Sequence, residues 1–423
     1  MLKKAGIIAF LGQIVAFTTV SAQFTIDYCY QKAHDNYPLI RQYDLIERSA
    51  AYTMSSIALN WLPQLQFSAK ATYQSDVPKI EINIPNYVDK ITYDWLNRDQ
   101  YSVNLEASQL IWDGGMMRAK RKQILSEAEV AEKQLDVSLY TIRERVNQLF
   151  FAILLLEAQI EQSRLYNNQL QQQYERVDAF VRNGLANQSD LNVIKAGQIK
   201  ALQMELQLNN KRKACIDMLS AFIGEPIAED VKPVKPDTTM PNLEIKRPEL
   251  SLFDAQLRNA SNKKMEINAD LTPKFALFFS GGYGRPGFNM LSNDFEWYYI
   301  GGVRFLWNIG NFYTLKNNNN TVFNSILSIQ TQQAAFLFNT NMDVKQKQHN
   351  IDNCRMLLNY DEQIIDLRHS IREASEAAVA NGTGTVIDLL TEINNEQFAQ
   401  QEKIQHEIEL MQAIYNLKYV LGQ

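Results

Sequence analysis

Few residues of this chain have the types and the spacing that catalysis or metal binding requires. The pair His406 and Glu407 is not followed by the second histidine that a zinc protease needs. No nucleophile and base stand at a spacing that suggests a catalytic group. We therefore predict that the chain is not an enzyme and has no catalytic residue, no metal site and no cofactor. The residues with side chains suited to catalysis or metal binding are the histidines His34, His349, His369 and His406 and the cysteines Cys29, Cys215 and Cys354.

The cysteines and one glycine-rich segment also favour structural roles. Three widely spaced cysteines are not the even, dense set of a small disulfide-rich protein, so we interpret them as small, half-buried helical residues. Residues 282–287, GYGRPG, satisfy the pattern G-x-G-x-x-G of dinucleotide sites. That site needs a helix directly after the pattern, inside a βαβ unit. No such unit is predicted, so we interpret the segment as a loop at an outer rim.

Two aspartates stand at equivalent places in a repeated phrase. Residues 183–191 read NGLANQSDL and contain Asp190, and residues 381–389 read NGTGTVIDL and contain Asp388. From each Asn-Gly, 42 residues align without a gap, and ten of these positions are identical. A carboxylate at such a place can cap a helix N-terminus or line a pore, and the two roles are compatible.

Each repeated phrase begins where a long helix is expected to end. Asn183 and Gly184 in one copy, and Asn381 and Gly382 in the other, supply the residues that favour the left-handed conformation after a helix. We predict turns at 183–189 and 381–386. A return helix should begin near each aspartate and continue to 223 in the first copy and to 422 in the second.

The helix that leads to the first turn is unusually long. Its apolar residues alternate in steps of four and three from Leu135 to Ile160, which is the seam of a coiled coil, and the register resumes from Leu170 to Val181. We predict one helix over about 116–182, roughly 100 Å long at about 1.5 Å per residue. The second half copies this pattern, with a predicted helix over about 312–380.

Four other segments alternate apolar and polar residues with period two. They lie at about 61–74, 100–112, 273–284 and 297–307. Such a strand is suited to lipid on one face and water on the other, although alternation by itself leaves strands of a soluble sandwich open. Residues 75–99, between the first two strands, should form a long outer loop.

The order of these elements predicts a tandem repeat. Residues 1–22 read as a secretory signal peptide, with Lys3 and Lys4 before a soft apolar run and small residues at the cleavage site. The first repeat covers 23–224 and the second covers 248–423, each with a helix, two strands, a long helix, a turn and a return helix. Between them, the connector at 225–247 is rich in proline and cannot be a regular helix.

Composition limits the partners. With 42 basic and 47 acidic residues the chain has a net charge of −5, which argues against a nucleic acid. After residue 22 no apolar run approaches the 18 or so residues of a membrane-spanning helix. Four strands also leave two open sheet edges, which lipid does not tolerate, so chains must join until the sheet closes. Two or three chains would each allow closure.

The chain resembles the TolC-type outer membrane efflux proteins over nearly all of its mature length. The resemblance rests on the signal peptide, the paired strands, the strand-to-helix passage LIWDGG, the phrase NGTGTVIDLL and the terminal LKYVLG. It implies a mixed α and β membrane protein. In this fold, four strands per chain form a twelve-stranded β-barrel in a homotrimer, and a long α-helical coiled-coil barrel continues it.

The resemblance also implies a location and a function. The protein would lie in the outer membrane, in contact with its lipid, and extend into the periplasm. It would be the passive, gated exit duct of a tripartite efflux or type I secretion system. Its partners would be a periplasmic membrane-fusion adaptor and an inner-membrane pump of RND, ABC or MFS type. The alternative, from a different class, is a periplasmic coiled-coil adaptor or structural protein without a channel.

The family finally implies roles for the two turns. Asp190 and Asp388 would form the gate at the inner constriction, while Asn183, Gly184, Asn381 and Gly382 would contact the adaptor. The chain departs from the family at Val379, Gly384 and Thr391, which replace a latch tyrosine, a latch arginine and a second constriction aspartate. The family's ionic latch is therefore not reproduced residue for residue.

Overall fold

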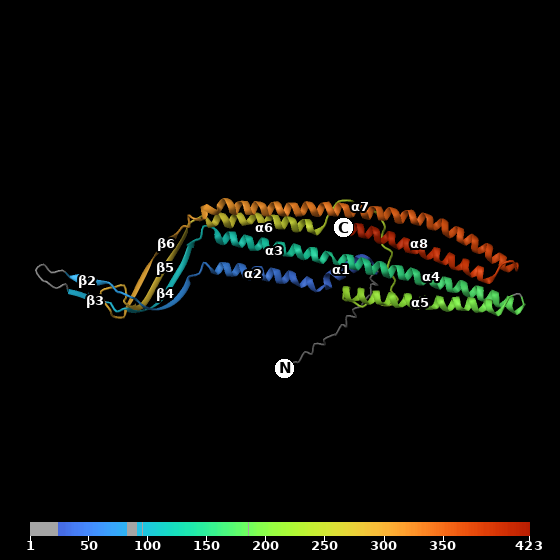
Figure 1. Cartoon of the computed structure of the whole chain (residues 1–423), viewed down its shortest axis with the longest axis horizontal. Helices are drawn as coiled ribbons and strands as arrows, with labels where there is room; N and C mark the ends of the chain where they lie inside the picture. The colour runs from blue at the N-terminus through green and yellow to red at the C-terminus, as the bar shows by residue number, and fades with distance from the viewer. Residues whose placement is uncertain (1–23, 83–90, 95, 185) are drawn as a thin grey trace, which may run out of the picture.

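The computed structural model describes residues 24–82, 91–94, 96–184 and 186–423, so the predicted signal peptide lies outside the described residues. The molecule is long and narrow, with the strands at one end and two tiers of helices running away from them (Figure 1). A mixed α and β fold with a four-stranded sheet is confirmed. None of the helices in the described ranges is long and apolar enough to cross a membrane.

The first half of the chain contains five α-helices and four strands among its described residues. In order they are α1 (Ile26–Asn36), the 3₁₀ helix η1 (Pro38–Arg41), α2 (Gln42–Leu59), β1 (Gln64–Tyr73), β2 (Lys79–Ile82), β3 (Ile91–Asp94), β4 (Asp99–Trp112), α3 (Met116–Tyr140), α4 (Ile142–Arg182) and α5 (Gln188–Ile223).

The second half is simpler. It contains α6 (Pro248–Asp270), β5 (Lys274–Arg285), β6 (Glu296–Leu306), α7 (Asn311–Ala380) and α8 (Val386–Leu421). The connector between α5 and α6 has neither helix nor strand, and its Val234 N–H donates to the carbonyl of Phe24, 2.9 Å away.

The large sheet is antiparallel and has the order β1-β4-β5-β6, so β1 and β6 are its edges. The helices lie side by side in two tiers. Near the sheet, α2 packs on α3, α3 on α6 and α6 on α7. Farther away, α5 packs on α4, α4 on α8 and α8 on α7, which is long enough to belong to both tiers (Figure 1).

The passage from β4 to α3 shows how the sheet is joined to the helices. Asp113 is buried, and its carboxylate accepts hydrogen bonds from the backbone N–H groups of Gly115 (2.9 Å) and Met117 (2.5 Å). Gly114 has φ 70°, and a Cβ there would lie 1.6 Å from Thr272 Oγ1. Glycine is therefore required for both the turn and the close approach.

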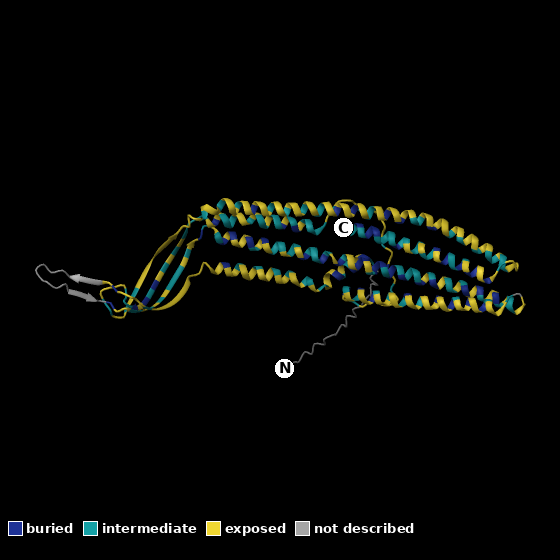
Figure 2. Ribbon diagram, viewed as in Figure 1, coloured by how far each residue is buried: buried dark blue, intermediate teal, exposed yellow. Residues whose placement is uncertain are grey.

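The largest apolar core lies midway along the molecule, where the two tiers meet. It joins α1, the α3–α4 junction and the C-terminal ends of α5 and α8, with Phe150 and Phe151 almost fully buried at its centre. This core contains most of the coiled-coil seam predicted between Leu135 and Ile160. The comparable residues of the second half, Tyr360 and Leu367 on α7, are instead exposed. Much of α7 is exposed along its length (Figure 2).

Two elements differ from the sequence-based prediction. The single helix predicted over 116–182 is two helices, because the regular pattern is interrupted at Thr141, whose hydroxyl donates to the carbonyl of Ser138, 2.8 Å away. A threonine hydroxyl that bonds the backbone competes with helical hydrogen bonding. In addition, the loop predicted at 75–99 contains the antiparallel hairpin of β2 and β3, in which Ile80 is paired with Tyr93.

Candidate functional site: the two inner hairpin turns

The two hairpin turns lie together at the end of the molecule farthest from the sheet (Figure 1). Helices α4 and α5 form the first hairpin, and α7 and α8 form the second. Contacts between α4 and α8 join the two hairpins, whereas α5 and α8 barely touch.

The first turn is built as a helix stop followed at once by a helix start. Asn183 ends α4, and its side-chain amide donates to the carbonyl of Ala179, 2.9 Å away. Gly184 follows with φ 72°. The chain then enters α5 at Asn187, whose backbone N–H donates to the carboxylate of Asp190 at 3.0 Å. Asp190 thus satisfies a donor at the N-terminus of α5.

The second turn has the same plan and connects its two helices over the same number of residues. Gly382 has φ 69°, and the backbone N–H groups of Thr383 and Gly384 both donate to the carbonyl of Ala378, at 2.9 and 3.1 Å. Thr385 caps α8, because its hydroxyl oxygen accepts from the backbone N–H of Asp388 at 3.1 Å. The same hydroxyl donates to the Asp388 carboxylate at 2.6 Å.

Both predicted gate residues therefore lie in the first turn of a return helix. The hydrogen bonds described for each carboxylate stay within its own turn, and the structure does not bring Asp190 and Asp388 together within one chain. Asp388 is exposed and Asp190 is half-buried. The capping role is thus observed, while a pore-lining role would have to come from the arrangement of several chains.

The three positions that depart from the family have local packing roles. Val379 is half-buried against the apolar cluster that α4, α5 and α8 form behind the turns. A Cβ on Gly384 would lie 3.0 Å from that of Ala378, so this turn leaves little room for a side chain. The hydroxyl of Thr391 donates to the carbonyl of Ile387, 2.9 Å away.

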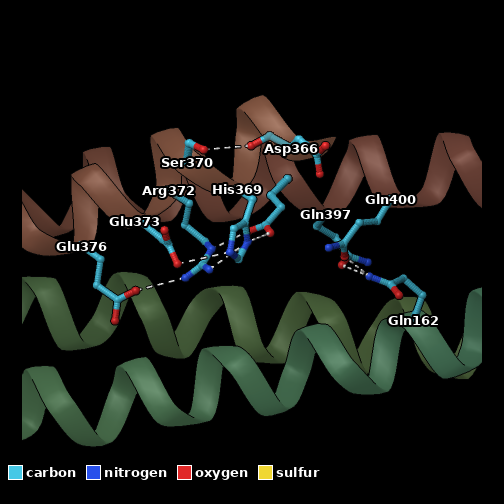
Figure 3. Close-up of polar contacts among 10 residues, drawn as sticks. Gln162, Asp366, His369, Ser370, Arg372, Glu373, Glu376, Gln397 and Gln400 are labelled. Carbon is cyan, nitrogen blue, oxygen red and sulfur yellow. Dashed lines mark hydrogen bonds and ion pairs between the residues drawn. The ribbon is translucent and has the colours of Figure 1, made fainter. Parts of the chain in front are cut away.

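A charged network joins α7, α8 and α4 a few helical turns behind the second turn. Figure 3 shows its residues on α7. Arg372 Nε lies 2.5 Å from Glu396 Oε2, and both side chains are largely buried. Arg372 also pairs with Glu376 at 3.0 Å, and Glu376 pairs in turn with Arg176 of the first hairpin. His369 lies against Glu396, with Nδ1 and Oε1 2.9 Å apart.

A second, uncharged set of contacts lies deeper along the same interface. Gln162 on α4 donates through Nε2 to the side-chain oxygens of Gln397 and Gln400 on α8 (Figure 3). The hydroxyl of Tyr166 donates to Asn394, and burial raises the pKa of this tyrosine, which keeps its proton on the oxygen. Polar side chains therefore fix how the two hairpins lie against each other.

These linking residues were not predicted from the sequence. Within α7 a signal existed, because Arg372 and Glu376 stand four residues apart, as do His369 and Glu373, and both pairs are in contact. No comparable signal pointed to Arg176, which is 200 residues from its partner.

The remaining chemically suited residues lie apart from one another. The structure has no group of three or more histidine, cysteine, aspartate or glutamate side chains arranged to hold a metal, within the residues it describes. All three cysteines are free, and burial raises the pKa of Cys29 to about 12. His406 bonds Asp361, with Nδ1 2.6 Å from Oδ2, across the interface of α7 and α8. GYGRPG runs from β5 into the turn before β6.

Comparisons with known proteins agree with this architecture. Residues 29–225 match the family model described as "Outer membrane efflux protein". No curated protein sequence matches the chain. Among solved structures, the chain resembles the outer membrane protein VceC of Vibrio cholerae, with 14% identity, a TM-score of 0.63 and coverage of 94% of this chain and 96% of that one.

Two further solved structures show the same fold. CusC, described with reference to transmembrane channel formation, has 14% identity and a TM-score of 0.66, covering 95% of this chain and 92% of its own. The open state of the Neisseria gonorrhoeae outer membrane channel MtrE has 14% identity and a TM-score of 0.63, with 94% and 88% covered.

The family match covers the first half of the chain, and the channel fold covers nearly all of it. This agrees with the predicted resemblance to the outer membrane efflux proteins. Residues 29–225 thus match the outer membrane efflux protein family, and nearly the whole chain has the fold of the solved outer membrane channels.

Proposed function

We propose that the protein is the passive, gated exit duct of a tripartite efflux or type I secretion system. In this proposal an inner-membrane pump of RND, ABC or MFS type supplies the energy, and a periplasmic membrane-fusion adaptor joins the pump to the inner hairpin turns. The elongated shape, with a sheet at one end and helical turns at the other, suits a protein that connects two compartments (Figure 1).

The register of the four-stranded sheet is the observation that carries the proposal. Residues directly opposite one another share a face, and the pairs Phe67–Leu105 and Val103–Tyr283 place odd-numbered apolar residues of β1, β4 and β5 on one face. Tyr283 in turn pairs with Trp297 of β6. These large apolar side chains are exposed. Lipid is the environment in which an exposed apolar face of this extent is stable.

The opposite face of the sheet is mostly polar and carries its charges. Arg304 on β6 forms an ion pair with Glu106 on β4 at 2.9 Å, and the hydroxyl of Ser280 donates to Asn104 at 2.9 Å. A sheet with lipid on one face and charges on the other is typical of the wall of a water-filled pore. The open edges at β1 and β6 then require further copies, and the family favours three, which would give a homotrimer with a twelve-stranded β-barrel.

The helices support the same closure. The flanking helix α7 exposes Tyr360, Ile364, Leu367 and Ile371 at steps of four and three, and on the opposite flank α5 exposes Ile199, Leu202 and Leu206. Each set is an apolar stripe with no partner among the described residues of this chain. In a ring of copies, α7 of one chain would cover α5 of the next, and the helices would form the coiled-coil barrel.

We further propose that the chain is a tandem repeat and that its two turns form the gate. The two halves share the order helix, strands, long helix and return helix, and ten of 42 positions are identical after each Asn-Gly. In a trimer, three copies of Asp388 and three of Asp190 would ring the inner opening and attract cations. Adaptor contact is proposed for the turns at Asn183 and Asn381.

Planar-bilayer recording of the purified mature protein tests this proposal. We expect cation-sensitive channels of one conductance class, because a closed barrel gives a pore of fixed width. A protein that forms no channel under any condition that releases the turns would refute the duct. Solubility of the mature chain without detergent would instead favour the periplasmic adaptor or structural protein, which the outer membrane family match already disfavours.

A further inference from the structure

A cavity of about 490 Å³ lies between the two hairpins, close behind the turns. Its floor is α4, and its two walls are α5 and α8, which have little direct contact with each other. The volume is in the range of sites that hold a drug-sized molecule, roughly 300–1,000 Å³. A molecule in this position would touch both hairpins at once.

The walls of the cavity are apolar although they face solvent. Val193 and Met204 line it from α5, and Ile387 and Phe398 line it from α8. Phe398 is 60% exposed and Ile387 is 57% exposed. Covering these side chains with an apolar molecule would be favourable, at about 25 cal/mol for each Å² removed from water.

Two polar groups at the cavity offer an anion a positive charge and an unpaired hydrogen-bond donor. Lys200 is its only charged lining residue, and the described part of the chain offers this lysine no ion pair. Gln397 is 7% exposed. Its oxygen accepts from Gln162 at 2.9 Å, while its Nε2 has no acceptor among the described residues. A buried donor without an acceptor is costly, and a ligand acceptor would satisfy it.

We propose that this cavity binds an amphipathic anion, with an apolar aromatic or aliphatic body and one carboxylate or sulfonate group. The apolar body would lie against Phe398 and Ile387, and the acidic group would meet Lys200. No carboxylate lines the cavity, so nothing there repels an anion. This absence is informative in a chain with more acidic than basic residues.

Occupancy of the cavity has a mechanical consequence. Because the ligand contacts α5 of the first hairpin and α8 of the second, it stabilises the arrangement in which the hairpins lie as they do here. Bound anions should therefore oppose any movement that separates the two hairpins. Binding does not depend on conduction, so it can be tested whether or not the protein forms channels.

The test uses two fluorescent probes with almost the same aromatic body. 8-Anilinonaphthalene-1-sulfonate is an anion, and N-phenyl-1-naphthylamine is its uncharged counterpart. Both are titrated into the full mature protein held in amphipol. We expect saturable binding of one anionic probe per chain, because the cavity lined by Lys200 is formed within a single chain.

Three variants separate the cavity from general adsorption. Lys200→Glu reverses the charge at an exposed position. It should lower the affinity for the anionic probe about tenfold or more and change the affinity for the neutral probe less than twofold. Gly197→Leu should remove saturable binding of both probes, because Gly197 lines the cavity. A Cβ there lies at an ordinary 3.7 Å from Leu170, so α5 can accept a side chain. Lys211→Glu, on α5 away from the cavity, is the matched control.

The outcomes are distinct. Equal affinity of the anionic probe for Lys200→Glu and Lys211→Glu would overturn the proposal, as would an absence of saturable binding in the unaltered protein. Fluorescence that rises without saturation and is unchanged by Gly197→Leu would mean adsorption to the amphipol or protein surface only. Circular dichroism of each variant confirms that the helices are intact.

Discussion

The guanidinium of Arg176 on α4 pairs with the carboxylate of Glu376 on α7, and this ion pair ties the first hairpin to the second. Glu376 is also held by Arg372, which in turn pairs with the largely buried Glu396 on α8. The position of the first hairpin is therefore coupled to charges inside the second hairpin.

We expect Arg176→Ala to increase the fraction of time that channels are open. Removing the guanidinium leaves Glu376 bound to Arg372 but releases α4. Arg176 is half-exposed, so the pair contributes only about 0.5–1 kcal/mol and the effect should be a few-fold. Single-channel recording measures the open fraction.

A double-mutant cycle and a matched control make this prediction specific. Arg176→Ala combined with Glu376→Ala should open the channel little more than the stronger single variant, because both remove the same link. Arg164→Ala breaks a comparable pair with Glu205 that lies within the first hairpin, at 2.9 Å. An equal rise in open fraction from Arg164→Ala would mean that the effect is general loosening.

Asp388 has an observed capping role and a proposed pore role, and two substitutions separate them. Asp388→Asn keeps an oxygen that can accept from Thr385 but removes the charge. It should weaken block by divalent cations with little change in stability. Asp388→Ala should weaken block by divalent cations and should also lower the free energy of unfolding by about 0.5–1 kcal/mol, because the contact with the Thr385 cap is lost. Unchanged cation block in both variants would remove Asp388 from the constriction.

Arg247 lies against a pair of stacked rings where the connector meets the helices. The rings of Tyr140 and Tyr419 have centroids 5.0 Å apart, and Arg247 Cζ lies 5.0 and 5.1 Å from them. Its guanidinium also pairs with Glu249, and both side chains are largely buried. Arg247→Ala should lower the free energy of unfolding by about 3 kcal/mol, because it leaves a buried carboxylate without its partner.

Lysine at position 247 should restore only part of this loss. An ammonium cannot form the planar fork that meets Glu249 while lying against the two rings. Arg258→Ala is the matched control, because Arg258 and Glu129 form an exposed pair that should contribute less than about 1 kcal/mol. Thermal or denaturant unfolding measures each variant, and equal losses of stability from Arg247→Ala and Arg258→Ala would contradict this role of Arg247.

Acid should weaken the contact between α1 and the start of the connector. Hydrogen bonds from Lys32 and then from Tyr28 lower the pKa of Glu225 below its ordinary 4.5. Because the folded-state pKa lies below the unfolded value, the stabilisation is fully present above about pH 4.5. It is lost as the pH falls through the lower, folded-state pKa.

Glu225→Gln should therefore reduce stability at pH 7 and make little difference below the folded-state pKa. Unfolding curves from pH 7 to pH 3 measure this convergence. Glu47→Gln is the control, because Glu47 is exposed and makes no ion pair within the described residues. A gap between Glu225→Gln and the unaltered protein that stays constant across this range would contradict the assignment.

Local signals in the sequence were enough to predict much of the architecture. Period-two alternation predicted all four strands of the large sheet, and each Asn-Gly predicted the end of a long helix, because glycine readily adopts the left-handed conformation observed at Gly184 and Gly382. Two features were not predicted. One is the hairpin of β2 and β3 within the predicted loop, and the other is the interruption at Thr141, where the competing hydrogen bond is local and weak.

The tertiary structure decided which surfaces meet. The same step pattern of four and three is buried at Ile153 on α4 but exposed at Leu367 on α7, since burial depends on neighbouring helices and not on the periodicity of one helix. The pair of Arg176 and Glu376 likewise joins residues 200 positions apart. Sequence by itself determined the elements and their turns. Only packing brought together the charged network and the cavity beside Lys200. These contacts join segments that are far apart in the sequence, and separation in the sequence does not predict distance in space.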